Sequence, residues 1–97
     1  MKMMDLKVET TNLPESQSFK DLILSLLKKT FSKKEEIKSV LVMVSRNEDV
    51  RAPFTVKMNL EEENEETLVT SAVSINYLAA FSQALKRMEA QLAKRRA

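Results

Sequence analysis

The chain has 97 residues and a formal net charge of +2, and it contains no cysteine, histidine or glycine. Because Cys and His are absent, the thiolate and imidazole groups of most catalytic and metal sites are missing. Without Gly the chain cannot form a glycine-rich phosphate-binding loop. The composition therefore disfavours an enzyme and indicates no metal, cofactor or small-molecule substrate. The length allows one small domain and excludes two.

Charge is distributed unevenly along the chain. Five of the 14 acidic residues lie in one run, EEENEE, at residues 61–66. The rest of the chain has 16 basic residues against 14 less 5, or 9, acidic residues, a surplus of seven. Such a surplus favours a polyanionic partner if the basic side chains share a face.

No apolar run approaches the roughly 18 residues that a membrane span needs. The N-terminal segment MKMMDLKVETTN also lacks the apolar core of a signal peptide, because charged residues interrupt it from Asp5 onward. We therefore expect a cytoplasmic protein without a membrane partner.

The first third of the chain predicts a strand and then a helix. Residues 4–9 alternate between apolar and charged, which is typical of a half-buried strand. After the break at TNLPES, apolar side chains follow three- and four-residue steps from Phe19 to Thr30, which predicts one face of a helix. The polar segment SKKEE, residues 32–36, predicts the helix exit and a loop.

Two strands are predicted next. VLVMVS, residues 40–45, is apolar on both faces, as expected of a strand with neighbours on either side. After a turn at RNED, residues 50–60 alternate apolar and polar, which predicts a long strand with one buried and one solvated face. Pro53 cannot donate to a strand ladder, so we expect a bulge or an unpaired edge beside it.

EEENEE predicts a solvated hairpin loop, because consecutive glutamates at a hairpin tip diverge and do not form a cation cage. ETLVTSAV, residues 66–73, predicts a further strand in which Leu68, Thr70 and Ala72 face one way. A longer apolar stripe with helical steps follows, made of Leu78, Phe81, Leu85, Met88 and Leu92.

The predicted fold class is α+β with the order β-α-β-β-β-α. We expect a four-stranded mixed sheet with two helices packed on one face. The first two strands would be a parallel pair joined by a right-handed crossover, and the last three an antiparallel meander. A single domain would span residues 1–97, with a basic C-terminal tail from about residue 95.

Basic residues mark the outer faces of both predicted helices. A helical wheel places Lys86, Arg87 and Lys94 roughly 120° or more from the centre of the last helix's apolar stripe. The basic residues of the first helix and its exit are Lys20, Lys28, Lys29, Lys33 and Lys34. Cations in a last turn also offset the helix dipole, by about 0.3 to 1 kcal/mol each, and a charged face serves solubility. If the helices pack side by side, however, the two surfaces become one field that suits a polyanion.

We interpret this field as an RNA-binding surface that contacts mainly phosphates. Base stacking needs exposed aromatic rings, and Phe31 and Tyr77 are the only candidates for exposure. Recognition by shape and backbone, as structured RNA allows, is the better prediction. The acidic run 61–66 would repel phosphate and confine RNA to the helical side.

The sequence resembles the ribosome hibernation promoting factor and ribosome-associated inhibitor family over nearly the whole chain. Residues 19–45, FKDLILSLLKKTFSKKEEIKSVLVMVS, look like that family's first helix running without gaps into its second strand. Residues 76–96, NYLAAFSQALKRMEAQLAKRR, look like its last helix, with an early tyrosine and alanines and a basic end.

The resemblance implies a short-type ribosome-binding inhibitor of translation that acts when growth slows. Such a protein binds ribosomal RNA of the small ribosomal subunit and occupies the channel used by mRNA and tRNA. The positions that match the family's RNA contacts are Lys20, Lys29, Arg87, Lys94, Arg95 and Arg96. The helical wheel alone adds Lys28 and Lys86.

An alternative reading is a protein-binding module or homodimer with no RNA partner. It rests on the regular strand at 50–60, whose edge could add a partner strand, and on Leu24, which lies off the first helix's core face and is a candidate for exposure. The sequence leaves both readings open.

Overall fold

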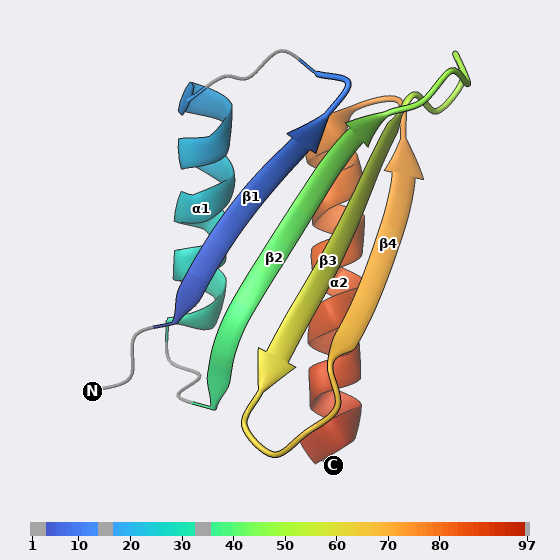
Figure 1. The fold of residues 1–97 in the computed structure, drawn as a ribbon. Coiled ribbons are helices and arrows are strands. Elements are labelled where there is room, and N and C mark those ends of the chain that lie inside the picture. Colours follow the sequence, from blue (N-terminus) through green and yellow to red (C-terminus); the bar gives the residue numbers. More distant parts are fainter. Residues whose placement is uncertain (1–3, 14–16, 33–35, 97) are drawn as a thin grey trace.

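The computed structural model describes residues 4–13, 17–32 and 36–96. A four-stranded sheet is covered on one face by two helices (Figure 1). The elements in chain order are β1 (Asp5–Thr11), α1 (Gln17–Phe31), β2 (Ile37–Arg46), β3 (Phe54–Glu62), β4 (Leu68–Ser74) and α2 (Tyr77–Arg96). The predicted α+β class and the order β-α-β-β-β-α are confirmed.

The strands lie in the order β1-β2-β3-β4. β1 pairs parallel with β2, and β2–β3 and β3–β4 are antiparallel pairs, as the sequence predicted. α1 packs on β1, while α2 packs on β3 and β4. Neither helix combines the length and apolar character that crossing a membrane takes, within the part of the chain that the structure describes.

The third strand differs from its prediction at both ends. It begins at Phe54, and Val50 is 86% exposed in the preceding turn. This turn is closed by a hydrogen bond of 2.7 Å from the Asn47 amide to the Pro53 carbonyl, so Pro53 lies just before the strand. β3 lies between β2 and β4, and it therefore provides no free edge, contrary to the alternative reading. The free edges of the sheet are β1 and β4.

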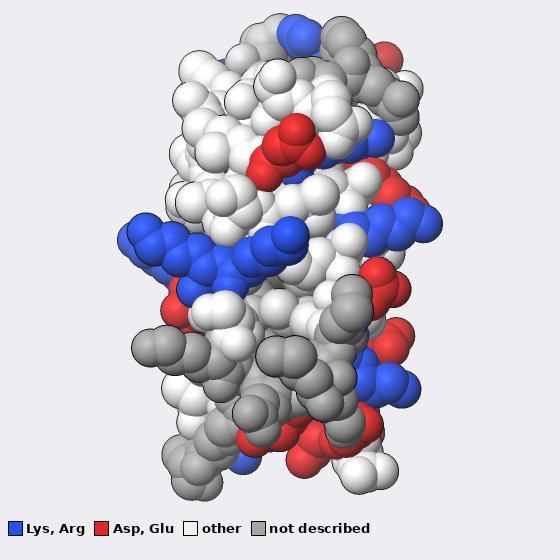
Figure 2. All heavy atoms as spheres, turned by 90° about the vertical axis from the view of Figure 1, so that its left-hand side faces the viewer, with Lys and Arg blue, Asp and Glu red and all other residues white. Residues whose placement is uncertain are grey.

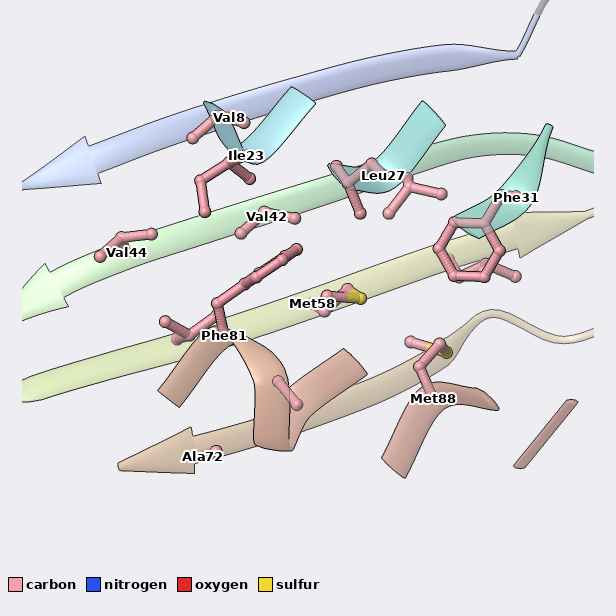
Figure 3. Close-up of a cluster of buried hydrophobic side chains, with 14 of the residues drawn as sticks. Val8, Ile23, Leu27, Phe31, Val42, Val44, Met58, Ala72, Phe81 and Met88 are labelled. Carbon is pink, nitrogen blue, oxygen red and sulfur yellow. The ribbon is translucent and has the colours of Figure 1, made fainter. Parts of the chain in front are cut away.

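The core lies between the sheet and the helices (Figure 3). Alternate residues of β2 and β3, and a stripe on each helix, meet there. The largest fully buried side chains are Phe31, Phe81, Ile23, Leu27, Met58, Leu60, Met88, Leu92, Val40, Val42, Val44 and Val56.

Two predictions of exposure are wrong. Phe31 is completely buried, because it continues the four-residue steps of Ile23 and Leu27 into the core. Leu24 is half-buried and packs against the core.

The N-terminus and the middle of α2 are fixed by side chains outside the helix. The Asn76 Oδ1 accepts hydrogen bonds from the backbone N–H of Leu78, at 2.8 Å, and of Ala79, at 3.3 Å, and so caps the N-terminus. In its middle, the buried Thr70 hydroxyl of β4 donates to the Ala84 carbonyl at 2.9 Å. The helix continues to Arg96, past the point where we expected a tail to begin.

Candidate nucleic-acid interface

The two helices carry a basic surplus. α1 has Lys20, Lys28 and Lys29 against one acidic residue, Asp21. α2 has five basic residues against one acidic residue, Glu89. The five are Lys86, Arg87, Lys94, Arg95 and Arg96. Both helices are therefore positively charged, as the sequence indicated. Some of their basic side chains are exposed, however, and others bind groups within the domain.

The lysines of α1 lie at different depths. Lys28 and Lys29 are exposed in the last turn, whereas Lys20 is half-buried near the helix start. Lys33 and Lys34 lie outside the described residues. Figure 2 shows the side of the molecule where α1 and β1 lie. The basic side chains that protrude on this side are interspersed with acidic ones. This side is mixed in charge, so α1 contributes two exposed cations and no uniform patch.

On α2, Lys86 and Lys94 are exposed, and the small exposed side chain of Ala90 lies between them in sequence. In the described part of the chain, neither lysine has a hydrogen bond or ion pair to another residue. An α-helix turns by about 100° per residue, so Lys86, Ala90 and Lys94 lie within about 100° of one another. These two ammonium groups are available to an external phosphate, and the alanine leaves room for a close approach.

Arg87 is held by the sheet. Its guanidinium donates a hydrogen bond from Nη1 to the backbone carbonyl of Ser71 in β4. β4 is the sheet edge opposite β1, and α1 packs on β1. Arg87 therefore lies at the far side of α2 from α1, and the expected continuous field across both helices is interrupted.

Arg95 is held by the acidic run. Its Nη1 lies 2.8 Å from the Glu62 Oε1, and its Nη2 donates to the Glu66 carbonyl at 2.7 Å. Its Nε lies 3.8 Å from the Glu65 Oε2. The side chains of Arg95 and Glu62 are 17% and 3% exposed, so this ion pair is largely buried. In this conformation Arg95 is not available to an external phosphate.

The expectation of a wholly solvated acidic loop is therefore wrong for Glu62. β3 extends to this residue, and its side chain continues the inward-facing series of Val56, Met58 and Leu60. Among the described residues, no three carboxylate, His or Cys side chains are placed to hold a metal ion. The run instead fixes the C-terminal end of α2.

The rings of Phe19 and Tyr77 join the two helices near their N-termini. Their centroids are 4.6 Å apart and their planes are perpendicular. The Tyr77 ring also lies beside the ring of Phe54 in β3, with 6.1 Å between the ring centroids. Both Phe19 and Tyr77 are half-buried, and edge-to-face contacts occupy them. With Phe31 in the core, the two rings proposed as exposed are both engaged, so stacking on bases gains no support.

By sequence, the chain matches no known family profile and no curated protein. In fold, the chain is similar to solved structures. A ribosomal subunit interface protein from Coxiella burnetii has a TM-score of 0.81 and 17% identity, over 97% of this chain and 98% of that chain. The N-terminal domain of Thermus thermophilus Protein Y has a TM-score of 0.75 and 16% identity, over 95% of this chain and 98% of that chain.

These similarities extend over almost the full length on both sides, so the whole domain has the same architecture as the two structures. At 16% and 17% identity they establish the fold. The fold that the sequence resemblance implied is thus confirmed.

Proposed function

We propose that this protein binds the small ribosomal subunit and inhibits translation by occupying the channel of mRNA and tRNA. The observation that carries the proposal is the full-length similarity in fold to a ribosomal subunit interface protein. The basic surplus of the two helices supports the same partner, because ribosomal RNA offers a dense array of phosphates. The protein would act in the cytoplasm, as a hibernation factor that silences idle ribosomes under stress.

The mechanism requires occupancy and no chemical step. Exposed ammonium groups release counterions from ribosomal RNA, which provides affinity with little base specificity. The folded domain then excludes tRNA and mRNA from the volume it fills. The protein is accordingly proposed to be a non-enzymatic inhibitor.

The contacts that we assign to this surface are Lys28, Lys29, Lys86 and Lys94. They are exposed and lie on the two helices. Arg95 is largely buried among its partners, so it would reach RNA only by leaving them. Arg87 is exposed and uses one of its nitrogens to bind Ser71, so it stays as a secondary candidate. Lys20 is half-buried and Arg96 closes α2, and both stay as secondary candidates from the sequence resemblance.

Displacement of tRNA tests the function directly. Labelled tRNA bound to small subunits should be released as the protein is added, with retention on a filter falling to background. A Lys86→Glu/Lys94→Glu variant should need a much higher concentration for the same release. Release of tRNA that is undiminished by this variant would refute the assigned surface, and no release by the natural protein would refute channel occupancy.

The matched control is Arg51→Glu/Lys57→Glu. Arg51 lies in the β2–β3 turn and Lys57 on β3, and both are exposed and belong to neither helix. Either double variant changes the net charge from +2 to −2, because each reversal contributes −2. The control therefore separates the placement of charge from its total, and it should displace tRNA nearly as well as the natural protein.

A further inference from the structure

The β4 edge differs from the β1 edge in its protection against pairing with another strand. β1 presents Asp5, Lys7 and Glu9, and the Lys7 Nζ lies 3.4 Å from the Glu9 carboxylate. Charged side chains on an edge strand discourage pairing with another chain. On the β4 side, by contrast, no residue from Thr67 to Leu85 is charged. The β1 edge is therefore protected from pairing by charged side chains, whereas the β4 strand carries no charge.

β4 also exposes apolar side chains at alternate positions. Val69 is 47% exposed and Val73 is 50% exposed, and Ile75, just beyond the strand, is 70% exposed. Val69 and Val73 point to the face of the sheet that the helices leave open, because Thr70 and Ala72 point into the core. β-branched residues on an uncharged, proline-free strand form a segment with a strong tendency to pair.

Among the residues that the structure describes, one side chain binds the outer backbone of this edge. The carbonyl of Ser71 accepts a hydrogen bond from Arg87, so it points outward and not into the β3–β4 ladder. Backbone groups alternate in direction along a strand, and those of Val69 and Val73 therefore also point outward. Arg87 covers the middle of this outward row.

The row is self-complementary. A second β4 running antiparallel, with the two-fold axis beside Ser71, places Val69 of each copy opposite Val73 of the other. Directly opposed residues of antiparallel strands have Cβ atoms about 4.5 to 5.5 Å apart, close enough for the two valines to pack. Such a pairing is isologous, which is the commonest symmetry of dimers.

We propose that two copies of this protein pair through β4, antiparallel about Ser71, and that Arg87 opposes this pairing. In the dimer each Ser71 carbonyl accepts a bond from the partner's backbone, and each Arg87 guanidinium, which occupies this outward carbonyl, must move to make room for the partner strand. The two-fold axis also brings the two guanidinium groups toward each other, which adds like-charge repulsion. Arg87 thus keeps the association weak, and the dimer is an eight-stranded sheet.

Sedimentation velocity over a concentration series tests this proposal, with the natural protein and an Arg87→Ala variant in parallel. Removing two competing bonds and one pair of like charges should make the dimer about tenfold tighter. Arg87→Ala that is no more associated than the natural protein would overturn the proposal.

Charge substitutions test the register. Val69→Lys in the Arg87→Ala background should abolish the dimer, since a lysine then faces an apolar valine on both sides of the axis. Val69→Lys/Val73→Glu in that background should restore it, because charges of opposite sign then face each other twice. Failure of this rescue would overturn the register.

Val50→Lys in the same background is the matched control, because Val50 is also an exposed valine and lies in the β2–β3 turn. It should leave the dimer intact. A dimer lost equally with Val50→Lys would place the interface elsewhere and refute pairing through β4. Circular dichroism shows whether each variant is folded, and the substituted side chains are exposed, so the fold should be kept.

Discussion

The ion pair between Arg95 and Glu62 should stabilise the domain strongly, although Arg95 lies in the last turn of α2. Arg95→Ala leaves the Glu62 carboxylate, 3% exposed, without its guanidinium, and removes the bond to the Glu66 carbonyl. Removing one partner costs about 3 to 5 kcal/mol in a fully buried pair and about 0 to 1 kcal/mol in an exposed pair. Because Arg95 is 17% exposed, we expect a loss of about 3 kcal/mol in the free energy of unfolding.

Urea and thermal denaturation measure this loss. In a domain of this size, about 3 kcal/mol corresponds to a fall in the melting temperature of roughly 12 to 24 °C. Lys94→Ala, one position earlier on α2 and exposed, should change the free energy by less than about 0.5 kcal/mol. An Arg95→Met/Glu62→Leu variant should recover much of the loss, because neither charge is then left buried without the other. An Arg95→Ala domain as stable as the natural one would refute the reasoning.

Three further predictions concern the core, the sheet–helix contact and the charged surface. Phe31→Ala should lower the free energy of unfolding by about 3 to 5 kcal/mol in urea denaturation, because Phe31 is completely buried. An almost unchanged free energy of unfolding would mean that this ring is exposed. Thr70→Val removes the donor to the Ala84 carbonyl and should cost about 1 to 2 kcal/mol in the same assay, and no loss would mean that this bond is unimportant. Binding to small subunits should weaken linearly with the logarithm of salt concentration. Lys86→Glu/Lys94→Glu should then lower the slope by at least about 2, and an unchanged slope would remove both lysines from the interface.

The fold could be predicted from the sequence because each element has its own period. Alternation in β1, β3 and β4 and three- to four-residue steps in both helices set the element order. The limits of β3 could not be predicted as well, because the alternation runs through Val50, while Asn47 and Pro53 close a turn there. The start of β3 is therefore determined by the hydrogen bonds of the preceding turn and not by the alternation of apolar residues.

Two features of the basic surface required the tertiary structure. Arg95 follows Met88 and Leu92 at helical spacing, and Glu62 continues the inward alternation of β3, so each carried a signal of burial in the sequence. Their pairing joins residues 33 positions apart, and only the packing of α2 over the sheet brings them together. Arg87 had no comparable signal, because its partner is a backbone carbonyl at the β4 edge.

Co-sedimentation of the purified domain with small ribosomal subunits at physiological salt tests the central claim most directly. The natural protein should pellet with the subunits, and Arg51→Glu/Lys57→Glu should do so nearly as well. Lys86→Glu/Lys94→Glu should stay in the supernatant while keeping its fold. Absence of the natural protein from the pellet would contradict ribosome binding, and equal pelleting of both double variants would contradict the role of the helical lysines.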